Sequence, residues 1–227
     1  MEVYIKMETK VKCYLNINFN LKMFKQNYEF IEIGTSNFDT IIENTDNETF
    51  GITIEPIKYY LDKLPNKRNV KKINKAVTDF VSSENKKIIM HYIPEDVIDK
   101  HNLGWWLKGC NSVNDYHLLH KNYNIQHLVS KEEVDVISIK DLFLENNVGC
   151  LNLLKIDTEG HDVIILQGLH DYLSKLENKD LYPKKIIFES NAMSSSESVD
   201  DIIKKFTSIG YELISRGEDT VIEYKLK

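Results

Sequence analysis

Residues 151–168, LNLLKIDTEGHDVIILQG, contain the pattern that decides the fold of this chain. Residues 151–157 are mostly apolar and predict a buried parallel strand. A polar turn, Asp157-Thr158-Glu159-Gly160-His161, follows that strand. After the turn, apolar residues recur at helical spacing as far as Leu176 and predict an amphipathic helix. A strand, a polar turn and a helix in this order indicate one unit of an α/β fold.

The same alternation of strand and helix precedes this stretch. Three short apolar runs predict strands, at residues 29–34 (EFIEIG), 50–56 (FGITIEP) and 71–77 (KKINKAV). The spacing of apolar residues predicts helices between these strands, at residues 38–45 and 56–64. Pro56 suits the first turn of the second helix.

The alternation continues toward the end of the chain. Helices are predicted near residues 141–147 and over residues 199–209, the second ending at Gly210. Residues 184–190 (KKIIFES) predict a strand, and residues 211–226 predict a hairpin. Together the elements predict a mostly parallel sheet with helices on both faces and an antiparallel hairpin at its C-terminal end.

Composition and charge narrow the class of protein. The chain has 227 residues, of which 42% are hydrophobic and 28% charged, as expected of a globular domain with a full core. Its net charge of −6 argues against binding a polyanion such as nucleic acid through overall charge. Cys13, Cys110 and Cys150 form no CxxC pair, so neither a disulfide framework nor a thiolate zinc site is predicted.

The organisation expected is one domain over residues 1–227, with an N-terminal extension over residues 1–28. An insertion at about residues 80–135 interrupts the alternation. It is not expected to be a second domain, because it has no polar linker at either end and no stretch long enough to form a separate hydrophobic core. No apolar run resembles a signal peptide or is long enough to span a bilayer. We therefore expect a cytoplasmic protein without a membrane partner, or one in the host cytoplasm if the source is a virus. The sequence predicts no particular oligomeric state.

Polar residues follow four of the predicted strands. In an open α/β sheet, ligands bind beyond the carboxyl ends of the strands. The glycine turn that begins at Gly34 leads into a helix N-terminus, which suits a phosphate or carboxylate group. Glu55 suits the hydroxyls of a ribose, so the two features indicate a nucleoside-bearing cofactor. Each acid could instead be a helix-start charge, but four polar strand ends in consistent order, three of them with an acid, are hard to explain as independent caps.

Five blocks of the sequence resemble the FkbM family of S-adenosylmethionine-dependent methyltransferases, from about Glu29 to about Tyr224. The blocks are EFIEIGTSNFDTI, FGITIEP, INKAVTD, LNLLKIDTEGHDVIILQG and IIFES. The most specific piece, LKIDTEGHDVIILQG, follows the family's KID-x-EG-x-E-x-x-x-L-x-G block with Asp162 where glutamate is usual. The first loop departs from the family, which often has a second glycine there. The resemblance implies a class I methyltransferase fold, a Rossmann-like sheet of seven strands, and O-methylation of a small hydroxylated acceptor such as a sugar or glycan precursor.

The resemblance also implies how S-adenosylmethionine is held. Glu32 and Gly34 would line its methionine end, Glu55 would hold the ribose, and Asp157 would face the sulfonium. Further polar contacts would come from the first loop, and the adenine would lie against the strand of the third block. The residues concerned are Thr35, Ser36 and Asn37 in the loop and Ala76 and Val77 in the strand.

Positioning the acceptor next to the methyl group does most of the work of the transfer. An acceptor hydroxyl must also lose its proton, so a nearby base is expected. His161 is the first candidate, although it could equally be a helix residue that faces solvent. Asp157 and Glu159 are the second candidates. No metal is favoured, but if one binds, the hard oxygen ligands expected are Asp157, Glu189 and Asn191.

The insertion is expected to form the acceptor site, as its flat apolar and hydrogen-bonding side chains suit a sugar or an aromatic acceptor. The residues are Trp105, Trp106, Asn111 and Ser112, with Glu189 at the neighbouring strand end. Either Trp could instead cover a small core of the insertion. Five histidines of the region lack metal-ligand spacing and are interpreted as surface or incidental residues: His91, His101, His117, His120 and His127.

Three other functions remain open at this point. A nucleic-acid methyltransferase usually has an N/D-P-P-aromatic motif where this chain has Asp-Thr-Glu-Gly, and the acidic balance also argues against it. A binding protein that kept the fold and lost the activity would not need Glu55, Asp157 and Glu159. A dinucleotide oxidoreductase would have the later glycines of GxGxxG, which are missing here.

Overall fold

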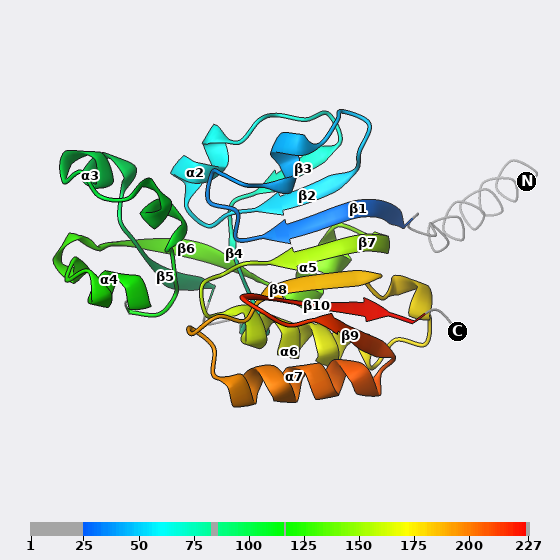
Figure 1. Ribbon diagram of the computed structural model, residues 1–227. Coiled ribbons are helices and arrows are strands. Elements are labelled where there is room, and N and C mark those ends of the chain that lie inside the picture. Colours follow the sequence, from blue (N-terminus) through cyan, green and yellow to red (C-terminus); the bar gives the residue numbers. More distant parts are fainter. Residues whose placement is uncertain (1–24, 83–85, 116, 226–227) are drawn as a thin grey trace, which may run out of the picture.

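The computed structural model describes residues 25–82, 86–115 and 117–225. The predicted extension at 1–28 and Cys13 therefore lie largely or wholly outside the described residues. Figure 1 shows one large sheet whose parallel strands point toward a smaller lobe formed by the insertion. No helix in the described ranges is long and apolar enough to cross a membrane.

The large sheet has seven strands in the order β3-β2-β1-β7-β8-β10-β9. Six of them run in the same direction, and β10 runs antiparallel to them, between β8 and β9. This confirms the predicted mostly parallel sheet with a C-terminal hairpin. The strands are β1 Gln26–Ile33, β2 Gly51–Ile54, β3 Val70–Ile73, β7 Val148–Ile156, β8 Lys185–Glu189, β9 Tyr211–Ser215 and β10 Asp219–Tyr224.

The register of the sheet places four strand ends level with one another. Ile33 pairs with Ile54 on one side and with Ile156 on the other, and Ile156 pairs with Phe188. The residues that follow these four, Glu55, Gly34, Asp157 and Glu189, consequently meet at one edge. The chain builds outward from β1 in one direction and from β7 in the other, so this edge contains the switch point at which α/β sheets bind ligands.

Helices cover both faces of the sheet, as predicted. On one face, α5 (Ile139–Glu145), α6 (Asp162–Leu173) and α7 (Ser196–Ser208) bury their apolar residues in the main core. On the other face, α2 (Lys58–Lys63) and the short 3₁₀ helix η1 (Ile41–Asn44) pack against Phe30 and Val70. A further 3₁₀ turn, η4 (Lys179–Leu181), precedes β8.

Two predicted elements differ from the observed ones. The helix predicted at residues 38–45 is only η1, because Asp39 has a φ of 54° and a capping box between Thr40 and Glu43 starts the turn after it. The strand predicted at residues 71–77 breaks after β3. The Asn74 side chain donates hydrogen bonds to the carbonyl oxygens of Glu55 and Pro56 at 3.0 and 2.7 Å, and β4 (Ala76–Thr78) joins another sheet.

The insertion forms a lobe with a second sheet of three strands in the order β4-β6-β5. Its strands β5 (Lys87–Tyr92) and β6 (Ser130–Ser138) carry between them α3 (Glu95–Lys100), η2 (Trp105–Gly109), α4 (Leu118–Asn122) and η3 (Gln126–Leu128). Contrary to expectation, the lobe has a small core of its own, made of Ile93, Ile98, Leu107, Cys110 and Ile125. Residues 83–85 and 116 of the insertion lie outside the described ranges.

Three histidines of the lobe are buried, so the interpretation of them as surface residues is wrong. His91, His117 and His120 are 4%, 3% and 0% exposed. Neither ring nitrogen of His120 has a hydrogen-bond partner among the described residues. Burial, reinforced by the nearby His117 and His91, lowers the pKa of His120 to about 4.

We predict that His120 makes the folded protein lose stability as the pH falls from about 6.5 to about 4. In this range the unfolded chain takes up a proton on His120, whereas the folded chain does not, and the full difference is roughly 3 kcal/mol. Urea unfolding at pH 7.5 and pH 4.5 measures the loss. His120→Leu should remove much of it, and His127→Leu, at an exposed position, should leave it unchanged. Equal pH dependence in both variants would show that His120 is not the cause.

Candidate functional site

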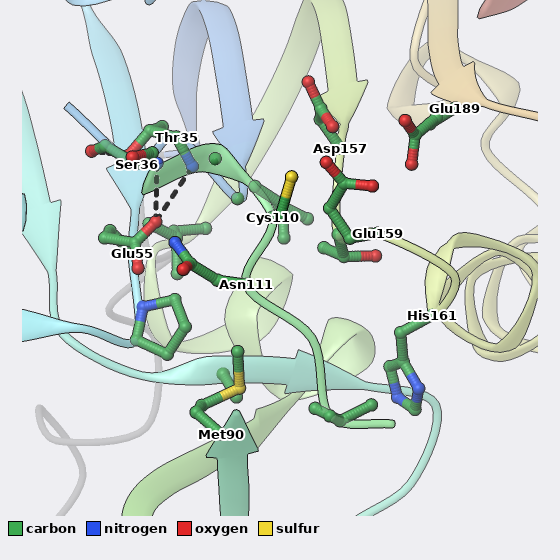
Figure 2. A pocket seen from close by; sticks show the side chains of 18 of the residues that line it. Thr35, Ser36, Glu55, Met90, Cys110, Asn111, Asp157, Glu159, His161 and Glu189 are labelled. Atoms are coloured by element: carbon green, nitrogen blue, oxygen red, sulfur yellow. Dashed lines mark hydrogen bonds between the residues drawn. The ribbon is translucent and has the colours of Figure 1, made fainter. Parts of the chain in front are cut away.

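A cavity of about 420 Å³ opens at the aligned strand ends, between the sheet and the lobe (Figure 2). Most of the residues predicted for a functional site line it. They are Gly34, Thr35, Ser36, Glu55, Ala76, Val77, Trp106, Asn111, Asp157, Glu159, His161, Glu189 and Asn191. Four other predicted residues do not line it: Glu32, Asn37, Trp105 and Ser112.

Glu55 anchors the loop that follows β1. Its side chain is buried, and Oε2 accepts hydrogen bonds from the backbone N–H groups of Thr35 at 3.1 Å and Ser36 at 2.7 Å. Oε1 accepts a third, from the N–H of Ile57 at 2.8 Å. Burial raises the pKa of Glu55 to about 7, against the opposing effect of these amides. The carboxyl group is thus fixed at the end of β2 and faces the cavity.

The loop from Gly34 to Asp39 needs its glycine at one position only. Gly34 has a φ of 79°, and a Cβ there would lie 1.8 Å from the carbonyl oxygen of Asp157. Ser36 also has a left-handed φ, of 47°, without being glycine. Its hydroxyl donates to the carbonyl oxygen of Lys108 at 2.8 Å, so the lobe helps to hold this loop.

Glu32 lies behind the cavity wall. Its side chain is 0% exposed, accepts a hydrogen bond from the N–H of Ile41 at 2.9 Å, and pairs with Lys155 Nζ at 3.2 Å. Lys155 lines the cavity, and its Nζ lies 3.7 Å from Asp157 Oδ2. Glu32 therefore acts on the cavity through Lys155. Asn37 also lies outside the lining, with a buried Oδ1 that has no partner within the described ranges.

Three carboxyl groups meet on the β7–β8 side of the cavity (Figure 2). Oxygens of Asp157, Glu159 and Glu189 all lie within 4.8 Å of one another. Burial raises the pKa of Asp157 to about 7, and the neighbouring Glu159 adds to this. Burial and the carboxylates of Glu159 and Asp157 also raise the pKa of Glu189 well above its usual range. At neutral pH Glu189 is therefore the carboxyl group of this cluster that retains its proton.

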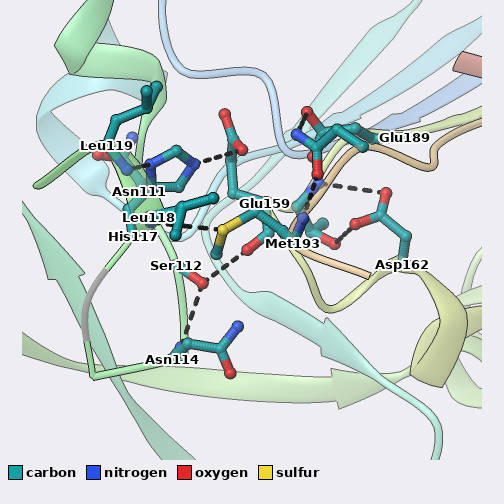
Figure 3. A network of polar contacts seen from close by, with 12 residues as sticks. Asn111, Ser112, Asn114, His117, Leu118, Leu119, Glu159, Asp162, Glu189 and Met193 are labelled. Carbon is teal, nitrogen blue, oxygen red and sulfur yellow. Dashed lines mark hydrogen bonds and ion pairs between the residues drawn. The ribbon is translucent and has the colours of Figure 1, made fainter. Parts of the chain in front are cut away.

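Glu159 is held in place by two residues of the lobe (Figure 3). Its backbone is left-handed, with a φ of 53°, an uncommon conformation for this residue type. The hydroxyl of Ser112 donates to the Glu159 carbonyl oxygen at 2.7 Å. His117 Nε2 lies 2.8 Å from Glu159 Oε2, while its Nδ1 accepts a hydrogen bond from the N–H of Leu119 at 3.1 Å. That second contact assigns the ring proton to Nε2, which donates to Glu159.

Sequence reasoning missed the part that His117 has in the site. No spacing signal marks His117, because its partner Glu159 is 42 residues away along the chain. Ser112, expected to contact an acceptor, is 0% exposed and supports Glu159 instead.

His161 lies apart from Glu159 and Glu189 in Figure 2, beside the end of β4. Its side chain faces the cavity rather than solvent, with 9% of the residue exposed. Nε2 is 3.1 Å from the hydroxyl of Thr78, which itself donates to Asp79 at 3.0 Å. Nε2 consequently carries the ring proton. Burial lowers the pKa of His161.

The two tryptophans lie in different environments at the mouth of the cavity. Trp106 lines the cavity, whereas Trp105 is 61% exposed and packs edge-on against Phe38, with ring centroids 5.2 Å apart. The ammonium group of Lys108 lies 5.0 Å from the ring centroid of Phe38. Phe38 also lines the cavity, so this aromatic pair continues the wall outward.

The possible metal ligands are partly engaged with each other. Asn191 Nδ2 donates to Glu189 Oε1 at 2.5 Å, and Asn191 Oδ1 accepts from the backbone N–H of Met193 at 2.8 Å. The predicted set of Asp157, Glu189 and Asn191 thus lacks a free amide oxygen. A second group, Cys110, His117 and Glu159, also has ligand atoms within 4.8 Å of one another. The proton on His117 Nε2 does not fit a metal ligand at that atom.

Comparison with protein-family models identifies a domain that covers most of the chain. Residues 32–213 match the methyltransferase FkbM domain. No curated protein matches the chain. The matched segment contains the last two residues of β1, all four aligned strand ends and the lobe. The order and direction of the strands in the large sheet are those of a Rossmann-like methyltransferase. On this evidence the chain belongs to the FkbM family of methyltransferases.

Proposed function

We propose that this methyltransferase uses S-adenosylmethionine to methylate a hydroxyl group of a small acceptor, a sugar or glycan precursor. The observation that carries the proposal is the alignment of Gly34, Glu55 and Asp157 at one edge of the cavity. Each offers what one part of the cofactor needs: a close backbone turn, an acceptor for ribose, and a carboxyl group for a positive charge.

The cavity residues fit such a cofactor. A carboxylate has about four acceptor positions, and three of those of Glu55 are taken by amides, so it can still accept a hydrogen bond from a hydroxyl group. Ala76 and Val77 give an apolar wall for the adenine. The carboxyl group of Asp157 favours a sulfonium over a neutral thioether, because only the sulfonium gains Coulomb energy from it. When bound, S-adenosylmethionine supplies the methyl group.

We assign the catalytic base to Glu159. It lines the cavity, its strained backbone is held by Ser112, and His117 orients its carboxylate. In the transfer, Glu159 takes the proton of the acceptor hydroxyl. His117 is a positioning residue, since protonation of its Nδ1 would break the bond from Leu119.

The other two candidates for the base, His161 and Asp157, have other roles in the proposed reaction. We assign His161 to the cavity wall on the β4 side, because it is bonded to Thr78 there and lies apart from the carboxyl cluster (Figure 2). Asp157 is paired with Lys155 and faces the sulfonium. No metal has a role in the proposed reaction.

The acceptor would lie between the carboxyl cluster and the aromatic mouth. Trp106 and the exposed Trp105 offer flat apolar faces, as sugar rings and aromatic groups require. We propose the cytoplasm, of a cell or of an infected host, as the compartment. Cys110 and Cys150 are free thiols, in keeping with a reducing environment.

Replacing Glu55 by alanine tests the cofactor part of the proposal. Because hydrogen bonds to a charged group are among the stronger ones, we expect Glu55→Ala to weaken binding of S-adenosylhomocysteine by about 100-fold. Isothermal titration calorimetry measures the change. Glu48→Ala, at an exposed acid before β2, is the matched control and should bind as the unmodified protein does. Unchanged affinity in folded Glu55→Ala would contradict this role of Glu55.

A further inference from the structure

Asn111, in the lobe, has an unused hydrogen-bond acceptor beside the cavity. It is 8% exposed and lines the cavity just after η2. Its Oδ1 is buried and has no hydrogen-bond partner within the described ranges. A buried amide oxygen without a partner is costly, so its presence at a ligand cavity requires an explanation.

The orientation of the Asn111 amide is fixed by its other end. Nδ2 donates a hydrogen bond to the carbonyl oxygen of Lys108 at 2.8 Å. Rotating the amide by half a turn would place Oδ1 against that carbonyl oxygen, two acceptors without a proton between them. The free group at Asn111 is therefore an acceptor and not a donor.

A short chain of hydrogen bonds connects this amide to Glu55. The Lys108 carbonyl oxygen that binds Asn111 also accepts from the hydroxyl of Ser36 at 2.8 Å. The N–H of Ser36 donates to Glu55 Oε2 at 2.7 Å. Figure 2 shows Asn111 and Glu55 on the same side of the cavity. The free Oδ1 thus belongs to the part of the cavity in which Glu55 lies.

Glu55 alone has too few free hydrogen-bond acceptor positions to bind both hydroxyls of a ribose. A ribose offers two neighbouring hydroxyl donors, whereas Glu55 has one of about four acceptor positions left after binding three amides. Holding both hydroxyls on Glu55 would require a backbone N–H to lose its partner. Asn111 Oδ1 offers the second acceptor without that loss.

We propose that Asn111 Oδ1 accepts a hydrogen bond from one ribose hydroxyl of the cofactor while Glu55 accepts the other. This inference rests on the proposed use of S-adenosylmethionine. It moves Asn111 from the acceptor site, where the sequence placed it, to the cofactor site. It also makes cofactor binding depend on the lobe as well as on the sheet.

Calorimetric titration with three ligands tests the contact: S-adenosylhomocysteine and its 2′-deoxy and 3′-deoxy analogues. We expect Asn111→Ala to weaken the binding of S-adenosylhomocysteine by about 10- to 100-fold. With the analogue that lacks the hydroxyl bound by Asn111, the variant and the unmodified protein should have nearly the same affinity. Asn122→Ala, at an exposed position of α4, is the control and should bind all three ligands normally.

Two results would overturn the inference. One is equal affinity of Asn111→Ala and the unmodified protein for S-adenosylhomocysteine. The other is an equal loss with all three ligands, which would indicate a structural effect. If the variant does not fold, the side-chain amide NMR signals of Asn111 in the unmodified protein should shift with S-adenosylhomocysteine and less with one deoxy analogue; equal shifts would contradict the contact. Absence of any binding by the unmodified protein would instead contradict the proposed function itself.

Discussion

Gly34→Ala should lower the free energy of unfolding by about 3–5 kcal/mol. Alanine is disfavoured at a φ of 79°, and its Cβ would lie 1.8 Å from the carbonyl oxygen of Asp157. That oxygen belongs to the backbone at the end of β7, so it cannot swing away as a flexible side chain would. Relief of the clash would separate the ends of β1 and β7 and displace the cavity wall. Urea denaturation measures the loss.

Gly217→Ala is the matched control for this substitution. The nearest atom to a Cβ at Gly217 is the Asp219 carbonyl oxygen at 3.7 Å, an ordinary contact. Its effect should stay within about 0.5 kcal/mol. Similar small effects at both glycines would contradict the close approach of the two strand ends.

Glu159→Gln should lower the rate of methyl transfer by about 10²- to 10⁴-fold, the contribution of a general base. Glutamine keeps an oxygen that can accept the hydrogen bond from His117 Nε2, so the arrangement in Figure 3 is expected to persist. What glutamine cannot do is take the proton of the acceptor hydroxyl. The rate is measured with any acceptor that the unmodified protein methylates.

Two comparisons separate this effect from a general loss of structure. Glu159→Gln should bind S-adenosylhomocysteine within about twofold of the unmodified protein, because Glu159 has no assigned cofactor contact. Glu145→Gln, at the exposed end of α5, should methylate at the normal rate. A Glu159→Gln variant with the normal rate would remove Glu159 as the base and return His161 and Asp157 to consideration.

The alignment of the strand ends could be predicted from the sequence because it follows from local patterns. Apolar runs that end in Gly34, Glu55 and Asp157 define where parallel strands stop, and parallel strands place their carboxyl ends at one edge. The family resemblance, carried by five blocks of which LKIDTEGHDVIILQG is the most specific, was confirmed by the match over residues 32–213.

What could not be predicted depends on contacts between distant segments. The strand expected at residues 71–77 breaks because Asn74 binds the backbone of Glu55 and Pro56, which no local pattern reports. The burial of His117 likewise arises only when the lobe folds over the turn at Glu159. The lobe's irregular sequence gives periodicity too weak to show which of its polar residues face the cavity.

A crystal structure of the protein with S-adenosylhomocysteine would show whether the cavity at the strand ends holds the cofactor. We expect one ligand in this cavity, with its ribose hydroxyls on Glu55 and Asn111 and its adenine against Ala76 and Val77. The sulfur should lie on the Asp157 side. An empty cavity at a saturating ligand concentration, or a ligand bound elsewhere, would rule out the proposed cofactor site.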